Sequence, residues 1–525
     1  MLIYKDNKTD KATYYKETCF LTLFVSITLF LISPDSYTHD LFNRVDSAWF
    51  FTCGKAWMNG MIPYVDFTDS KGPLLWLIFG IGYLISNTTY IGMFWISCLT
   101  YTITYIINYK TAKLFLEDSK SATLAILLLT LSYFNSWMHY EFRAEDCCLP
   151  FISIILYRLC YVIYNQATGK HNLYITNFLL GLCLMAIILI KFSLALMLGP
   201  AYLYYLYYLI REKKNLIIAL LLFMAGCAVT ALPFLIYFLL QGNLTDFIQE
   251  YFINTLLTVQ GANSTSTFID EWLSIFCEQW AARTILLTVC IVGCCWISRQ
   301  VPNDKIFPFI IFLGFYTISL HHAYANHYLG GCLIFSIWLC MAISKSMEQE
   351  LAKHFRKTVS LVSVSILLFL FFLNYTTEQG LLIRNAFFYD NQDRTDYYNV
   401  SWYMSQIHKP KIIYLETKEY GYGTPADALP GCKYWSTQLG ATPAMLSEQL
   451  NSLNNADFII TVRENPNYSH NIAALQEANF RKCYSYNMTD ATFEVYTKHS
   501  LKSPPANFHV SNSDVLFKRK VLQLK

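Results

Sequence analysis

Charged residues are scarce in this chain. They make up 14% of its 525 residues, whereas soluble globular proteins carry about 25%. This scarcity excludes an ordinary water-soluble enzyme, and the net charge of +3 is too small to indicate a nucleic-acid partner. The sequence also lacks a CxxC pair, an H-E-x-x-H motif, a glycine-rich nucleotide fingerprint and an internal repeat. The absence of these motifs argues against a zinc metalloprotease, a dinucleotide-binding protein and a repeat protein.

Apolar residues are abundant, at 54% of the chain, and recur in long runs up to about residue 374. Most of the 16 cysteines lie inside these runs as small hydrophobic residues and form no recognisable disulfide framework. The pattern predicts an α-helical polytopic membrane protein. The candidate spans are 17–33, 90–108, 120–136, 147–164, 173–190, 192–210, 216–240, 283–298, 306–320, 328–344 and 358–374. The first ends without a small-x-small cleavage site, so we expect a retained anchor.

The segment 72–86 is apolar but short. At 1.5 Å per residue it extends about 22 Å, less than the roughly 30 Å hydrocarbon core. Lysine and arginine collect in cytoplasmic loops. Suppose that the N-terminus is cytoplasmic and that 72–86 does not cross the membrane; most Lys and Arg residues of the short loops then lie on the cytoplasmic side. If 72–86 does cross, most of them lie on the outer side instead. We therefore predict a re-entrant or interfacial helix there, about eleven spans in a bacterial inner or plasma membrane, and an extracytoplasmic C-terminus.

The composition changes after residue 374. Apolar runs shrink to strand length at 412–415 and 458–462, and they alternate with helical patterns. This alternation predicts a small extracytoplasmic α/β domain over 375–525, following a membrane domain over 1–374. The predicted helices of this domain are 397–408, 443–454 and 470–479, and a further strand is 492–497. By analogy alone, the domain covers the mouth of a site or helps to bind an acceptor.

Charged residues gather in the predicted outside segment 34–89. Asp46 begins a predicted interfacial helix over 47–58, and Asp69 and Lys71 precede the short helix 72–86. Carboxylates beside an ammonium at a membrane surface are suited to bind an anionic headgroup next to a base. The alternative is that Asp46 and Asp69 cap helices and that Lys71 extends to the headgroups.

Further charges lie at predicted outside ends of spans. Arg143, Glu145 and Asp146 directly precede an apolar run, and charge so close to the membrane is expensive. Lys191 interrupts the apolar stretch 173–210 and is suited to an anionic partner such as a lipid phosphate. A solvated loop and a lysine that extends to the headgroups are the alternatives.

A histidine cluster lies in the predicted outside segment 321–327. His321, His322 and His327 have a spacing seen in zinc sites, but no H-E-x-x-H motif accompanies them. Contact of His327 and Tyr328 with phosphate or sugar is the stronger interpretation, and ordinary interfacial aromatic residues are the alternative.

The motifs together are similar to a known family. They are D-x-x-x-F at Asp46–Phe50, G-x-x-P-Y-x-D-x-x-D-x-K-G-P-L at Gly60–Leu74, the acidic loop Glu141–Asp146 and Gly181–Pro200 around Lys191. The chain resembles the bacterial GT-C membrane glycosyltransferases, in particular the protein mannosyltransferase-like group, glycosyltransferase family 39, which includes aminoarabinose transferases for lipid A. The resemblance covers roughly residues 17–345 in layout and is most specific within 46–74.

The resemblance implies an inverting transfer of a hexosyl or pentosyl group from a polyprenyl-phosphate donor to a lipid, glycan or protein acceptor at the outer membrane face. By motif, Asp46 matches the first-loop acid, a general base or acceptor-positioning group. Glu145 matches the second-loop acid, with Glu141 and Asp146 as near alternatives. Lys71 matches the lysine that contacts the lipid phosphate.

The sequence departs from the family pattern in two places. It has Ser70-Lys71-Gly72-Pro73 where relatives often have Glu-Lys-Pro-Pro, so Asp69 replaces the acidic neighbour of the lysine. It also has His327-Tyr328 where Arg-Tyr is often found. The reaction class is unchanged by both departures.

The chemistry of this reaction class fits the residues. A base must reach the acceptor hydroxyl, and cations must stabilise the departing phosphate. Lys71 and Lys191, with Arg143 or Arg283, supply that charge, so the sequence requires no cofactor and gives no support for a divalent metal. The tail of a lipid donor lies between helices and among membrane lipids, which explains the many spans without a nucleotide-binding fold.

Other functions make different predictions. A transporter or flippase would place ionisable residues at mid-bilayer depth in matching halves of the chain. Here the charges collect at one face, and no inverted repeat is visible. A polysaccharide polymerase or ligase would keep the lipid-linked sugar and change the acceptor, so the sequence leaves this alternative open.

Overall fold

The structure is a computed structural model. It describes residues 8–33, 35–36, 45–133, 142–166, 172–256, 280–320, 331–332, 334–352, 392–437, 442–488 and 491–504. The helices before residue 353 are α1 (Lys8–Ile32), α2 (Asp46–Met58), α3 (Pro73–Ile85), α4 (Ile91–Phe115), α5 (Ser119–Tyr133), α6 (Ala144–Tyr164), α7 (Leu173–Met197), α8 (Gly199–Arg211), α9 (Leu216–Gln241), α10 (Leu244–Phe247), the π-helix η2 (Ile248–Asn254), α13 (Trp280–Gln300), the 3₁₀-helix η3 (Pro302–Asp304), α14 (Phe307–Leu320) and α15 (Ser336–Ala352).

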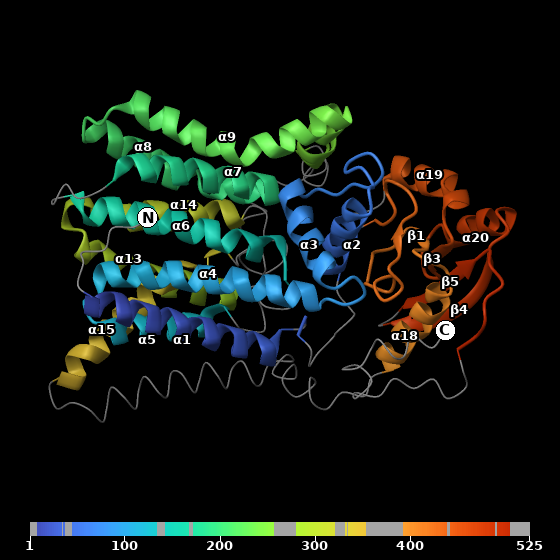
Figure 1. Ribbon diagram of the computed structural model, residues 1–525, viewed down its shortest axis with the longest axis horizontal. Helices are drawn as coiled ribbons and strands as arrows, with labels where there is room; N and C mark the ends of the chain where they lie inside the picture. Colours follow the sequence, from blue (N-terminus) through green and yellow to red (C-terminus); the bar gives the residue numbers. More distant parts are fainter. Residues whose placement is uncertain are drawn as a thin grey trace.

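Within the described residues, 4 helices, α4, α6, α7 and α9, are long and apolar enough to cross a membrane. In α6, 78% of the most apolar 18-residue stretch of the helix is buried inside the protein, whereas in α9 the corresponding share is only 17%. Helix α6 therefore lies at the centre of the bundle, whereas α9 lies at its edge with an apolar surface suited to lipid. Figure 1 shows these long helices running side by side, with α9 at one margin.

Helices cover most of the predicted spans, and two spans differ. In place of 328–344, α15 begins at Ser336 and ends at Ala352. The stretch 192–210 was expected to form one continuous helix, but its first residues belong to the end of α7, and α8 begins at Gly199. The reason is Pro200, which occupies the first turn of α8, where a missing N–H is tolerated. The predicted span 358–374 and the predicted domain boundary after residue 374 lie outside the described residues, and the predicted 328–344 is described only from 331 onward, without 333.

Helices α2 and α3 form a layer at one end of the bundle, between the long helices and the C-terminal domain (Figure 1). The short apolar helix expected over 72–86 is α3, and the helix expected over 47–58 is α2. Helix α2 is buried along the stretch from Ser47 to Ala56. Phe50 packs edge-on against Phe79 of α3, with ring centroids 5.5 Å apart. A purely interfacial helix would keep a polar face in water, so α2 is instead an internal element that joins two parts of the protein.

The C-terminal part is a small α/β domain, as the alternating pattern predicts. Its helices are α18 (Gln392–Ser405), α19 (Pro443–Asn451) and α20 (Tyr468–Glu477), with a 3₁₀-helix, η5 (Leu453–Asn455). Its strands are β1 (Lys411–Tyr414), β2 (Leu429–Pro430), β3 (Phe458–Val462), β4 (Arg481–Met488) and β5 (Ala491–Thr497). The sheet order is β2-β1-β3-β5-β4. Strand β1 runs parallel to β2 and β3, whereas β5 is antiparallel to β3 and β4.

The C-terminal domain is seated on the α2–α3 layer by aromatic and polar contacts. The rings of Trp49 and Trp435 lie 5.0 Å apart, between α2 and the loop after β2. The Tyr83 hydroxyl of α3 donates to Asp427 at 3.3 Å. The domain therefore lies directly over the end of the bundle where the predicted site residues gather.

Candidate active site

The loop between α2 and α3 is folded back on itself by Tyr64. This residue has a φ of 66°, a left-handed conformation that is uncommon outside glycine. Its backbone N–H donates to the carbonyl of Phe67 at 2.7 Å, and its hydroxyl donates to the carbonyl of Lys71 at 3.0 Å. Its buried ring packs 4.6 Å from that of Trp76. These contacts fix the backbone that carries Asp69 and Lys71.

Asp69, Ser70 and Lys71 form a short hydrogen-bonded series. The Asp69 carboxylate accepts from the N–H of Ser70 at 2.6 Å, and the Lys71 ammonium donates to the Ser70 hydroxyl at 2.9 Å. Burial raises the pKa of Asp69, while the nearby ammonium of Lys71 opposes the rise and the Asp46 carboxylate adds to it. Lys71 also lies 5.7 Å from the centre of the Phe50 ring, within the range of a cation–π contact.

Helix α7 breaks at Lys191. This residue has φ −154° and ψ 97°, which are extended rather than helical values. The freed carbonyl of Ile190 accepts from the N–H of Gly72 at 3.0 Å. A Cβ atom at Gly72 would lie 2.0 Å from the carbonyl oxygen of Leu189, so the approach of the two backbones requires glycine. Lys71 and Lys191 therefore flank one backbone junction.

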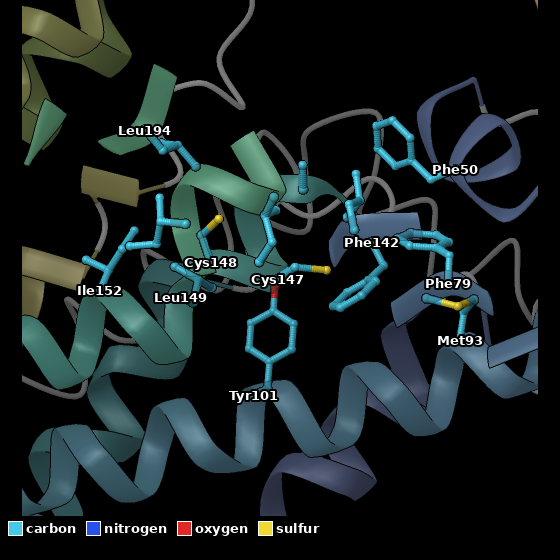
Figure 2. Packing of buried hydrophobic residues seen from close by; sticks show 14 of the residues in the cluster. Phe50, Phe79, Met93, Tyr101, Phe142, Cys147, Cys148, Leu149, Ile152 and Leu194 are labelled. Atoms are coloured by element: carbon cyan, nitrogen blue, oxygen red, sulfur yellow. The ribbon is translucent and has the colours of Figure 1, made fainter. Parts of the chain in front are cut away.

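The first turn of α6 supplies the acidic residues. Arg143 is the N-cap, and its N–H donates to Asp146 at 2.8 Å in a capping box. The other oxygen of Asp146 accepts from the hydroxyl of Tyr101 at 2.7 Å. Asp146 was predicted to bind substrate, but both of its oxygens are engaged in holding the start of α6. Figure 2 shows Tyr101 reaching from α4 toward this turn, beside Cys147.

Glu145 and Lys191 form an ion pair between α6 and α7. The Lys191 ammonium contacts the Glu145 carboxylate, and their side chains are only 11% and 8% exposed. Lys191 thus pairs inside the protein rather than extending to lipid headgroups. The surrounding packing is apolar, with Phe142 lying 6.1 Å from Phe79, ring to ring (Figure 2).

Asp46 completes the group from the start of α2. Its carboxylate lies 3.9 Å from Nε of Arg143, and its side chain is 29% exposed. Val45 is the N-cap of α2 and Gly72 is the N-cap of α3, so neither Asp46 nor Asp69 caps these helices. The Asp46 side chain is therefore partly exposed beside Arg143.

Some predicted residues are not placed. His327, Tyr328, His321 and His322, like Glu141, lie outside the described residues, and nothing is described of the Arg283 side chain. Within the part of the chain that the structure describes, no group of histidine, cysteine or acidic side chains is arranged to hold a metal ion.

The segment after α9 also contributes to the site, and none of the sequence motifs pointed to it. Its first part forms α10 and the π-helix η2. The Glu250 carboxylate lies 2.7 Å from the Lys433 ammonium and accepts from the Tyr434 hydroxyl at 3.1 Å. Tyr251 contacts the break of α7. The only local signal was the helical spacing of Phe247 and Tyr251, which periodicity alone does not tie to a site.

The comparisons with known proteins agree with this architecture. Residues 70–237 match the family described as dolichyl-phosphate-mannose-protein mannosyltransferase. The solved structure of ArnT from Cupriavidus metallidurans bound to undecaprenyl phosphate is 12% identical, with a TM-score of 0.52, and the similarity covers 93% of this chain and 98% of that one. The apo structure of the same protein is 12% identical, with a TM-score of 0.56, covering 92% and 98%. No curated protein sequence matches the chain.

The match of fold extends over both the helical bundle and the C-terminal domain, because it covers more than nine-tenths of each chain. The matched family region begins inside the motif Gly60–Leu74 and ends within α9. The predicted resemblance and fold class are therefore confirmed. The chain is an integral membrane protein with the GT-C fold, and its residues 70–237 match the protein mannosyltransferase family.

Proposed function

We propose that the protein is an inverting membrane glycosyltransferase that uses a polyprenyl-phosphate-linked sugar. The observation that carries the proposal is the convergence of Asp46, Lys71, Arg143 and the Glu145–Lys191 pair at one end of the bundle. These residues come from α2, the α2–α3 loop, α6 and α7. The similar ArnT structure bound to undecaprenyl phosphate supports this class of donor.

Asp46 is the proposed general base. Its partly exposed carboxylate takes the proton of the acceptor hydroxyl as the oxygen attacks C1 of the sugar. The bond between C1 and the phosphate oxygen breaks on the opposite face, and the polyprenyl phosphate leaves with the bonding electrons. The neighbouring guanidinium of Arg143 holds the carboxylate in place by charge attraction.

Lys71 and Lys191 are the proposed cations for the departing phosphate. They flank the junction between Gly72 and Ile190, and a cation in a water-poor site stabilises developing negative charge strongly. Glu145, predicted as a second catalytic acid, pairs with Lys191, and we assign it to orienting that ammonium. The engaged carboxylate of Asp146 maintains the start of α6. Asp69 orders the Lys71 loop through Ser70.

The proposed orientation places this end of the bundle, with the C-terminal domain, outside the cytoplasm and the N-terminus inside. The opposite end carries Arg211, which pairs with Asp304 at 2.7 Å next to Lys213 and Lys214. Clustered basic residues favour the cytoplasmic side. The acceptor is a lipid, glycan or protein that reaches the site beneath the C-terminal domain, and the transferred group is a hexosyl or pentosyl residue.

Profiling of lipid-linked sugars in a deletion strain tests the proposal. We expect a polyprenyl-phosphate sugar to accumulate, to disappear on complementation with the wild type, and to remain with Asp46→Asn. Asp66→Asn is the matched control, because Asp66 is a nearby acid of the α2–α3 loop whose carboxylate accepts from the N–H of Ile62. An unchanged lipid profile, or purified protein that moves the donor across vesicles without sugar transfer, contradicts the proposal.

A further inference from the structure

The break of α7 exposes backbone groups that a single side chain satisfies on both sides. The Tyr251 hydroxyl donates to the carbonyl of Ile188 and accepts from the N–H of Phe192 at 3.1 Å. The first partner precedes Lys191 and the second follows it. Because a backbone polar group left unsatisfied in a membrane interior costs several kcal/mol, the break depends on such partners.

Tyr251 itself is rigidly held. It is fully buried in the π-helix η2, a rare element that is frequent at functional sites. Its ring lies 4.6 Å from that of Phe252, 5.5 Å from that of Phe192 and 5.9 Å from that of Phe247. These contacts leave its hydroxyl directed at one place, the gap in the α7 ladder.

Glu250, the residue before Tyr251, connects η2 to the C-terminal domain. Glu250 binds both the ammonium of Lys433 and the hydroxyl of Tyr434 in the C-terminal domain. The carbonyl of Lys433 in turn accepts from the N–H of Thr68, in the loop that carries Lys71. The π-helix is therefore braced between the C-terminal domain and the α7 break.

We propose that Tyr251 is a positioning residue that holds the α7 break open and thereby keeps Lys191 at Glu145. This inference rests on the proposed function only in its consequence for sugar transfer. A regular helix turns about 100° per residue, so a break that closes redirects the Lys191 side chain. Gly72 supplies a further contact, to the carbonyl of Ile190 on the N-terminal side of the break.

Tyr251→Phe tests the proposal because it keeps the packed ring and removes both hydrogen bonds. The matched control is Tyr202→Phe. The Tyr202 hydroxyl of α8 donates to the carbonyl of Leu180 at 2.9 Å, so the control removes a bond to the same helix far from the break. We expect at least tenfold faster hydrogen–deuterium exchange over residues 188–193 in Tyr251→Phe and no change there in Tyr202→Phe.

Sugar transfer gives the second measurement. We expect Tyr251→Phe to lower kcat at least tenfold with KM for the donor changed less than threefold, and Tyr202→Phe to keep kcat within twofold. In a Lys191→Met background, Tyr251→Phe should lower kcat by less than twofold further, because it acts through the lysine. A full tenfold loss in that background overturns the positioning role.

The exchange measurement needs no substrate and so separates the two proposals. Unchanged exchange over 188–193 in a folded Tyr251→Phe protein overturns the inference even if the wild type transfers sugar. Faster exchange in Tyr251→Phe supports the inference even if the wild type transfers none, and that absence of transfer then contradicts the proposed function alone. Gel filtration and the unfolding temperature in detergent establish that the variant is folded.

Discussion

The Lys191 ammonium contacts the Glu145 carboxylate across two helices, from the break of α7 to the first turn of α6. Both side chains are nearly buried and have lost most of their hydration, so each charge is stabilised mainly by the opposite charge of its partner. The pair therefore fixes where a cation of the site lies as well as how the two helices meet.

Removal of either partner should destabilise the protein. Lys191→Met or Glu145→Leu leaves an uncompensated buried charge, which costs about 3–5 kcal/mol. The double variant replaces both ions by apolar groups, so we expect it to unfold in detergent at a higher temperature than either single variant. Transfer should be strongly slowed in all three. A double variant less stable than both single variants contradicts this account of the pair.

Asp46→Asn should remove catalysis while the protein remains folded. The amide keeps the size of the side chain, whose contact with Arg143 is long at 3.9 Å, but it has no basic oxygen to take a proton. Loss of a general base lowers kcat by about 10²–10⁴-fold. The measurement is the initial rate of sugar transfer in vesicles, together with binding of undecaprenyl phosphate, which should not change. Wild-type turnover by Asp46→Asn would remove the assignment of the base.

Features with a local sequence signal were predictable. Such a signal is the point where an apolar run begins, ends or is interrupted, which a hydropathy pattern shows directly. It marked the helices α2 and α3, the acidic start of α6 and the irregular position at Lys191. The strands β1, β3 and β5 were predicted for the same reason. Strand β4 was not predicted. Its sequence, RKCYSYNM, alternates Tyr484, Tyr486 and Met488 with polar residues, but it lacks the continuous apolar run of β1 and β3 and pairs with β5 at the edge of the sheet.

Contacts between distant segments had no local signal. Gly72 donates to Ile190 more than a hundred residues away, and nothing in either neighbourhood encodes the partner. The contacts of Asp146 also had no local signal, since a carboxylate at this position serves equally as a ligand or as the acceptor of a capping box. Such roles follow from tertiary packing, which composition and periodicity do not contain.

Acid should weaken the C-terminal sheet through Glu494. Its side chain is fully buried; burial acts to raise its pKa, but hydrogen bonds from Tyr468, Tyr496, Arg463 and Lys482 hold the pKa at about 2, below the ordinary 4.5. A lowered folded-state pKa gives stability that is present above about pH 4.5 and lost as the pH falls toward about 2.

The unfolding temperature of the full chain should therefore fall between pH 5 and 3, with a smaller fall in Glu494→Gln, whose side chain does not titrate. At pH 6 the variant should be the less stable protein. Glu477→Gln is the control, because Glu477 is exposed on α20 and should leave the pH dependence unchanged. Equal slopes for wild type and Glu494→Gln would show that Glu494 does not govern this transition.

Gly72→Ala should disrupt the site through the backbone alone. The added Cβ would lie 2.0 Å from the Leu189 carbonyl oxygen and 2.4 Å from the Leu189 carbonyl carbon, and backbone atoms yield less than side chains. The loop must then withdraw, which breaks the Gly72–Ile190 hydrogen bond and separates Lys71 from Lys191. We expect a lower unfolding temperature and at least a hundredfold loss of transfer. Gly199→Ala is the control, because a Cβ at Gly199 meets nothing within 4 Å, and equal activity of the two variants would show that the close approach at Gly72 is not needed.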